Sequence, residues 1–319
     1  WNPLTLIRHY LLRILPSGKS VYLVVALSLI LQGTPLSSLA EPEQVSPEKK
    51  EVLGKYDSFL PRGDIRRFVG ETLYFDISFL WFDQAAVASM SFFERDGQFH
   101  SLLTAETKGF IGALTSYRKH VYKATFDIVD NGNRVRTTEF ERLVTIGDIQ
   151  EKTLHHMDYN TRVHSWIAYR NDEVIELEKQ DIPEGIILDD ILAAFYNMRN
   201  SVYGDLKKGH TYQIYTLPEK GHDRIFVEIL NEAKEEQYRI EAGREKADEF
   251  LIDVIVPKEI FKTKEGKLRF WTSKHYLPLS TTVKDYFMFG DLHAQFVKRE
   301  FAPQKDWRDT IIGKSTTHP

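Results

Sequence analysis

The chain has 319 residues, of which 42% are hydrophobic and 13% aromatic, so it can bury a sizeable core. Its formal net charge of −4 argues against a general nucleic-acid-binding protein, which would need a basic surface for phosphates. The absence of cysteine excludes disulfides, thiolate metal sites, cysteine nucleophiles and a lipid-modified N-terminal cysteine.

Residues 1–40 have the pattern of a secretory signal peptide. Arg8, Arg13 and Lys19 precede the apolar run 21–31, and Ala40 ends a stretch of small residues suited to cleavage. That run is shorter than the ~20 residues that span a bilayer, which favours cleavage over an uncleaved membrane anchor. We expect an exported protein, periplasmic in a two-membrane bacterium, that keeps no stable membrane span after cleavage.

The next segment, residues 41–66, is polar and rich in Pro, Glu and Lys, and predicts a flexible lead-in. From Gly70 onward apolar and polar residues alternate with period two, as in strands with one buried face. Asn131 and Gly132 mark a hairpin turn, and residues 110–118 fit either a short helix or a loop. Strands are predicted over residues 73–79, 86–93, 99–107, 121–129, 135–146, 150–158, 163–170 and 173–178.

Residues 189–202 predict the one long helix of the mature chain. Leu192, Phe195 and Met198 recur at the spacing of a helical face. Asp189 is the expected N-cap, with Asp190 in the first turn.

Short strands resume after this helix, with turn signals between most of them. The pattern predicts a mainly β, antiparallel and curved sheet wrapped around the helix, as a single domain over residues 67–300 followed by a polar tail, 301–319. The later strands are predicted over residues 211–217, 224–230, 236–241, 249–256, 268–273, 279–287 and 292–300.

His155, His156, Asp158 and His164 are the densest group of candidate metal ligands or acid–base residues. Neighbouring residues on a strand point to opposite faces, so His155 and His156 cannot easily share a site. No recognised zinc spacing is present, which favours cross-strand or surface histidines over a metal-dependent hydrolase.

Which of these side chains share a face of the sheet depends on the length of the turn between residues 158 and 163. If the turn is the pair Asn160-Thr161, His164 faces Met157 and joins His155 and Trp166 on one side of the sheet. A turn one residue longer reverses that pairing.

Known catalytic signatures are missing from the sequence, including GxSxG, Ser-x-x-Lys and glycine-rich phosphate loops. Asp189 and Asp190 could form a catalytic dyad, but helix capping explains both acids. We therefore predict no catalytic residue, cofactor or metal. Arg199 has two readings: a stem packed on the core with its head paired to an acid, which we favour, or a contact to an anionic head group at the rim of a cavity.

Several blocks together resemble the bacterial exported-protein family called domain of unknown function 3108. Residues 70–78 resemble its opening, residues 271–273 with Pro278 its W-x-S…P stretch, and residues 290–294 its closing G-x-L-x-A. Its central D-x-L-x-x-x-Y-x-x-R pattern is matched by Asp190, Leu192, Tyr196 and Arg199.

The resemblance spans roughly residues 70–300, with the blocks in the family's order. Ala86 stands where a glycine is common, and His275 replaces an expected aspartate, which puts any contact of that aspartate in doubt. The resemblance implies an exported β-rich protein of unestablished function, similar in architecture to the half-open barrels of periplasmic lipoprotein carriers, and it brings no catalytic residues.

Two non-enzymatic functions follow as expectations. The first is a binding or carrier protein of the cell envelope, with a hydrophobic or lipid-like ligand held between helix and sheet. The second is an envelope assembly protein that offers a sheet edge or its tail to another protein. The candidate ligand-binding residues are Leu192, Phe195, Tyr196, Arg199 and Trp271.

Overall fold

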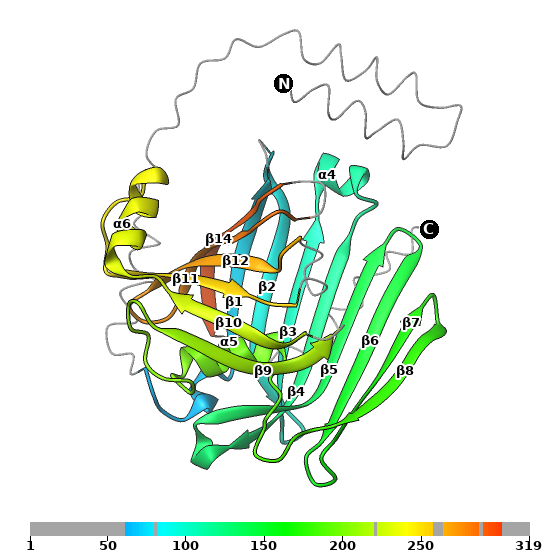
Figure 1. The fold of residues 1–319 in the computed structure, drawn as a ribbon. Coiled ribbons are helices and arrows are strands. Elements are labelled where there is room, and N and C mark those ends of the chain that lie inside the picture. The colour runs from blue at the N-terminus through cyan, green and yellow to red at the C-terminus, as the bar shows by residue number, and fades with distance from the viewer. Residues whose placement is uncertain (1–60, 80–81, 220–221, 258–263, 287–289, 302–319) are drawn as a thin grey trace, which may run out of the picture. The chain divides into compact units, whose positions relative to one another are not determined.

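The computed structural model describes residues 61–79, 82–219, 222–257, 264–286 and 290–301. These residues form a 14-stranded sheet in which every neighbouring pair of strands is antiparallel (Figure 1). The spatial order runs from β8 down to β1 and then from β14 down to β9. The predicted mainly β, antiparallel, curved sheet is confirmed.

The strands agree closely with the alternating sequence pattern, because one face of most of them is buried. Their bounds are β1 Glu71–Phe79, β2 Phe82–Arg95, β3 Gln98–Thr107, β4 Lys119–Val129, β5 Arg134–Ile146, β6 Ile149–Asp158, β7 Val163–Arg170, β8 Glu173–Asp181, β9 Thr211–Glu219, β10 His222–Ile229, β11 Glu249–Ile255, β12 Lys267–Ser273, β13 Pro278–Val283 and β14 Leu292–Phe301.

Helix α5, Ile191–Arg199, lies inside the curve of the sheet (Figure 1). On one side Leu192, Ala193 and Tyr196 pack in a core with residues of β2 to β6. On the other side Ala194 packs in a second core with residues of β9 to β12. The helix therefore packs against two stretches of the same sheet. We call the face of the sheet toward α5 the inner face and the opposite one the outer face.

Two helical features differ from the sequence-based expectation, and a third decides between two alternatives that the sequence left open. The N-cap of α5 is Asp190 rather than Asp189, and the helix covers Ile191–Arg199 rather than the predicted residues 189–202. Residues 236–241, predicted as a strand, belong to helix α6, Glu232–Glu241, whose N-cap Asn231 accepts a hydrogen bond from the N–H of Lys234. Helix α4, Gly109–Leu114, resolves the choice between helix and loop.

Helix α6 was missed because its sequence is almost entirely polar, so the apolar periodicity that marks a helix is weak. Its acidic first turn and Asn231 cap are the signals that indicate the helix. Within the described ranges, no helix has the length and apolar character needed to cross a membrane.

The ordered body starts earlier than residue 67. A 3₁₀ helix, Ile65–Phe68, places Ile65 and Phe68 fully buried in the core beside α5, so the end of the expected lead-in is packed. The expected signal peptide, residues 1–40, and the expected tail after Phe301 lie outside the described residues.

Among the described strands, β8 and β9 are the two edges of the sheet. The edge of β9 is partly covered by the segment before α5, because Asp189 forms a parallel bridge with Thr216 and its N–H donates to the carbonyl of Tyr215 (2.9 Å). Residues Glu173 to Lys179 of β8 are all exposed. The two edges of the sheet are therefore not equivalent.

Candidate functional site

Buried polar groups fix the start of α5 to the sheet. Asp190 caps the helix by accepting from the N–H of Leu192 (2.7 Å), and its other carboxylate oxygen accepts from the Thr137 hydroxyl (2.5 Å). Asp189 accepts from Arg134 Nη2 and from the Tyr203 hydroxyl, both at 2.6 Å. Burial raises the pKa of Asp189 to about 6 and that of Asp190 to about 7. Capping and pairing explain both acids, which are shielded from solvent.

The middle of α5 is held by a side-chain amide. Asn197 accepts from the N–H of Val135 (3.0 Å) and donates to the carbonyl of the same residue (2.9 Å). It thereby completes the backbone hydrogen bonds of β5 in the way that a neighbouring strand would. Because both groups are buried, losing this side chain would leave two backbone groups without partners.

The end of α5 is held by a buried ion pair. Arg199 donates to both carboxylate oxygens of Glu71, at 2.5 and 2.9 Å, and Arg299 Nε lies 2.7 Å from the same carboxylate. Burial works against the charge on Arg199, but Glu71 outweighs it and the pKa of Arg199 is raised. The predicted structural reading of Arg199, with its head paired to an acid, is confirmed.

The structure divides the five candidate ligand-binding residues between different environments. Leu192 and Tyr196 are fully buried, and the Tyr196 ring packs against Phe92 with centroids 4.8 Å apart. Phe195 is partly buried and meets the Tyr196 ring edge-on at 5.1 Å. These side chains, with Arg199 in its ion pair, are packed against protein atoms.

Trp271 lies in a different hydrophobic cluster from Leu192 and Tyr196, although Phe195 packs against the cluster that holds Trp271. It pairs with Leu251, whereas the adjacent Phe270 packs in the core beside α5, so Trp271 is on the outer face. There Arg239 of α6 lies 4.8 Å from its ring centroid. Trp271 therefore does not line the same space as Leu192 and Tyr196.

The histidine group is also divided by strand alternation. Met157 pairs with His164, as the Asn160-Thr161 turn requires. His155 Nδ1 lies 3.0 Å from His164 Nε2, and both rings stack near Trp166 on the inner face. Burial lowers the pKa of His155 to about 3 and that of His164 to about 4, so both rings are neutral at pH 7.

The other two members of the group have separate surroundings. His156 is exposed on the outer face, and Asp158 closes the turn after β6 by accepting from the N–H groups of Asn160 (2.8 Å) and Thr161 (3.1 Å). Among the described residues, no group of three or more His, Asp or Glu side chains is placed to hold a metal ion. The four residues that the sequence grouped together therefore do not form one site.

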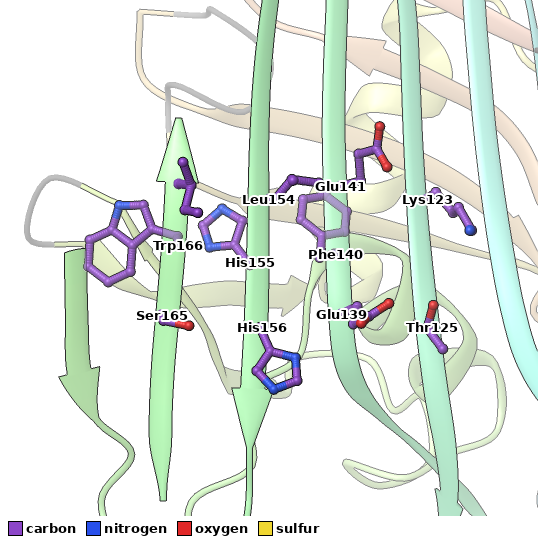
Figure 2. A pocket seen from close by; sticks show the side chains of 11 residues that line it. Lys123, Thr125, Glu139, Phe140, Glu141, Leu154, His155, His156, Ser165 and Trp166 are labelled. Atoms are coloured by element: carbon purple, nitrogen blue, oxygen red, sulfur yellow. The ribbon is translucent and has the colours of Figure 1, made fainter. Parts of the chain in front are cut away.

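A pocket of about 340 Å³ lies over β4 to β7, next to the β8 edge (Figure 2). Cross-strand pairing arranges its outer-face side chains in two rows. One row runs Lys123, Glu141, Leu154 and Ile167, and the other runs Thr125, Glu139, His156 and Ser165. The first row continues onto β8, where Leu177 pairs with Ile167. Apolar side chains therefore lead from the pocket to the sheet edge.

Strand β8 exposes large apolar side chains at that edge. Val174, Ile175 and Leu177 have 58%, 62% and 68% of their surface in solvent. Next to them on the inner face stand Glu176 and Glu178, which pair with Ala168 and Trp166 of β7. The indole Nε1–H of Trp166 donates to Glu176 Oε1 (2.8 Å).

A hydrogen bond just after β8 shows which backbone groups of this strand point toward β7 and which point away from the sheet. The N–H of Ile182 donates to the carbonyl of Arg162 (2.8 Å), in register with the pairing of β7 and β8. Antiparallel ladders alternate between pairs that exchange hydrogen bonds and pairs that do not. The backbone groups of Glu178 and Gln180 therefore point toward β7, and those of Leu177 and Lys179 point away from the sheet.

The sequence located β8 as a strand but did not show that it is an edge. Its pattern, Glu-Val-Ile-Glu-Leu-Glu-Lys, breaks the period-two alternation of the other strands, with Val174 and Ile175 adjacent. A mixed pattern with charge on both faces is the signal that could have indicated an edge.

Comparisons with known proteins add little to this geometry. No family model matches the sequence, and no curated protein matches it. One similar solved structure is a β-barrel-like protein of domain of unknown function DUF1849 from Brucella abortus, with 7% sequence identity and a TM-score of 0.39. The match covers 74% of this chain and 99% of that chain. A likeness this distant carries no argument about function.

Proposed function

We propose that this protein is a non-catalytic binding protein of the cell envelope that takes up an extended segment of a partner protein along β8. The membership in domain of unknown function 3108 and the periplasmic location, with export by the signal segment 1–40, are parts of this proposal. The observation that carries it is the edge of β8, beside which no further described strand lies and where large apolar side chains and outward backbone groups occur together.

Strand addition uses these two features together. The N–H and C=O groups of Leu177 and Lys179 point outward and can hydrogen-bond an added strand, which gives affinity that does not depend on the partner's side chains. The exposed side chains of Val174, Ile175 and Leu177 offer apolar contact area on the same strand. If the β8 edge had only a structural role, polar residues at these positions would be expected, because an exposed apolar edge strand promotes aggregation.

We favour strand addition at the β8 edge over ligand binding in a cavity beside α5. Leu192 and Tyr196 are fully buried and pack in the core between α5 and the sheet, and buried hydrogen bonds hold the helix at its start, middle and end. A carrier of hydrophobic ligands needs an apolar cavity, and admitting a ligand here would require breaking these buried hydrogen bonds. The carrier hypothesis, with Leu192, Phe195, Tyr196, Arg199 and Trp271 as its lining, remains a prediction that ranks second.

Site-specific photocrosslinking in living cells tests the proposal. A photoreactive amino acid at Leu177 on β8 is compared with one at Val297 on β14, which is also partly exposed. We expect a discrete protein adduct at position 177 and none at 297. The second element of the test is Lys179→Pro, which removes an outward N–H without removing a β7 hydrogen bond. Lys179→Ala is its control, because it removes the same side chain and keeps the N–H.

The adduct should disappear in Lys179→Pro and persist in Lys179→Ala. An adduct that survives in the proline variant contradicts strand addition. Native mass spectrometry of the purified protein tests the carrier hypothesis. A co-purifying lipid, together with no adduct at position 177, would favour that hypothesis.

A further inference from the structure

The chemistry of β8 also specifies the kind of segment that it accepts. Resting on the proposed function, we infer that the partner segment is an extended strand in which an apolar residue is flanked on both sides by basic residues. The inference comes from the side chains that alternate along the free edge.

Two acids face the added strand on the inner side of the sheet. Glu176 and Glu178 are exposed, and their side chains share the inner face because Glu176 pairs with Ala168 and Glu178 with Trp166. Residues of an added strand that lie opposite these acids have their side chains on the same face. Lysine or arginine at those positions would be attracted, and glutamate or aspartate would be repelled.

The residue between the two acids faces the other side. Leu177 is on the outer face, in the row with Ile167 and Leu154 that leads to the pocket. The partner residue opposite Leu177 therefore meets an apolar surface. Because the acids lie on either side of Leu177, the expected order basic–apolar–basic is the same whether the partner runs parallel or antiparallel to β8.

The same charges oppose pairing of two copies of β8. The strand carries Glu173, Glu176, Glu178 and Asp181 against one base, Lys179. An antiparallel pair centred on Leu177 would put Glu176 of each copy opposite Glu178 of the other, and like charges directly opposite are destabilising. A basic partner is therefore favoured over a second copy of the chain.

Peptide binding to the purified full chain tests the inference at low ionic strength. The probes are three peptides of equal length: alternating lysine and valine, alternating glutamate and valine, and the lysine–valine peptide with N-methyl groups on alternate amides. Each exposed charge pair contributes modestly and the two pairs act together, so the lysine peptide should bind roughly ten-fold more tightly than the glutamate peptide. N-methylation should abolish binding, because it removes the hydrogen bonds of the added strand.

The charge-reversal variant Glu176→Lys/Glu178→Lys should invert the preference between the lysine and glutamate peptides. Its matched control, Glu232→Lys/Glu241→Lys, makes the same change of net charge on exposed residues of α6. The control should keep the preference of the natural chain. A control that also inverts the preference would mean that only net charge is sensed, which would overturn the inference.

The outcomes separate the inference from the proposed function. Equal binding of the lysine and glutamate peptides, with N-methylation still abolishing binding, overturns the basic–apolar–basic pattern and leaves strand addition intact. Binding of none of the peptides, or binding that Lys179→Pro does not change, contradicts strand addition at β8. A dimer that forms through β8 without any peptide would instead make a second copy the occupant and overturn the inference.

Discussion

Helix α5 and strand β8 are close in sequence, but they are held in very different ways. At α5, polar side chains are buried and paired on the helix start, middle and end, and the surrounding apolar residues are fully packed. At β8, apolar side chains are exposed and the backbone of Leu177 and Lys179 has one side toward solvent. One segment has its polar groups paired within the chain, and the other exposes apolar side chains and one side of its backbone to solvent.

This difference indicates where binding energy is available. The buried polar groups at α5 already have hydrogen-bond partners. A ligand that binds there must first break those hydrogen bonds, so it gains little net hydrogen-bond energy. At β8 each new contact buries apolar area or pairs a backbone group that is hydrated in the free protein. The contrast implies that changes at α5 should affect stability and changes at β8 should affect binding.

The largest effect is expected for Glu71→Gln, which removes the charge between Arg199 and Arg299. Breaking a buried pair by removing one partner typically costs about 3–5 kcal/mol, because the remaining charge stays buried without compensation. We expect a loss of this size in the free energy of unfolding, measured by urea denaturation. Glu173→Gln on exposed β8 is the matched control and should stay within about 0.5 kcal/mol. Equal effects of the two changes would contradict the contrast.

The inner-face histidines should make stability depend on pH. The folded pKa values of His155 and His164, about 3 and about 4, lie below the usual 6.5, so the unfolded chain binds more protons in acid. The stabilisation is complete above about pH 6.5 and is lost as the pH falls toward 4. We expect this pair to lower the free energy of unfolding by several kcal/mol as the pH falls from 7 to 4, measured as the difference in pH dependence from a variant that lacks one of the two rings.

The variant His164→Asn checks the assignment, because it removes one titrating ring from the buried pair. Its unfolding free energy should fall less steeply between pH 6.5 and 4 than that of the natural chain. His156→Asn makes the same substitution on the exposed outer face and is the matched control. Identical slopes in all three proteins would show that the inner-face pair is not the source of the acid sensitivity.

The α5 cap gives a smaller effect. Asp190→Ala removes the acceptor for the N–H of Leu192 and should cost about 1–2 kcal/mol of unfolding free energy. Asp190→Asn keeps an acceptor oxygen and should cost less. Burial raises the folded pKa of Asp190 to about 7, so its contribution weakens as the pH rises from about 4 through 7, opposite in sign to the histidines. The asparagine variant should lack that weakening, and an unchanged pH profile would contradict this assignment.

The sequence predicted the strands well because alternation and turn residues are local signals. Asn131 and Gly132 sit at the predicted turn between β4 and β5 with positive φ values of 54° and 96°, which suit Asn and Gly. Helix α6 was not predicted because its sequence has little apolar periodicity. The local pattern is informative only where burial on one face imposes a period.

The candidate site was less predictable because its features depend on contacts between distant residues. The acid that pairs with Arg199 could not be identified, since Glu71 is 128 residues away in the chain. Trp271 was grouped with Leu192 and Tyr196, but it packs in a separate cluster and on the opposite side of β12 from Phe270, which depends on the register of that strand. The edge position of β8 depends on the order of the whole sheet.

The smallest effect on stability is expected for Leu177→Ser on β8. The side chain is already 68% exposed, so its removal gives up little buried area and should change the unfolding free energy by no more than about 0.5 kcal/mol. Binding of the alternating lysine–valine peptide should nevertheless weaken several-fold, because the apolar row from Leu154 and Ile167 would end before the edge. Titration calorimetry and urea denaturation of the same preparation measure both quantities. A variant that loses stability but binds normally would reverse the assignment of structure to α5 and of binding to β8.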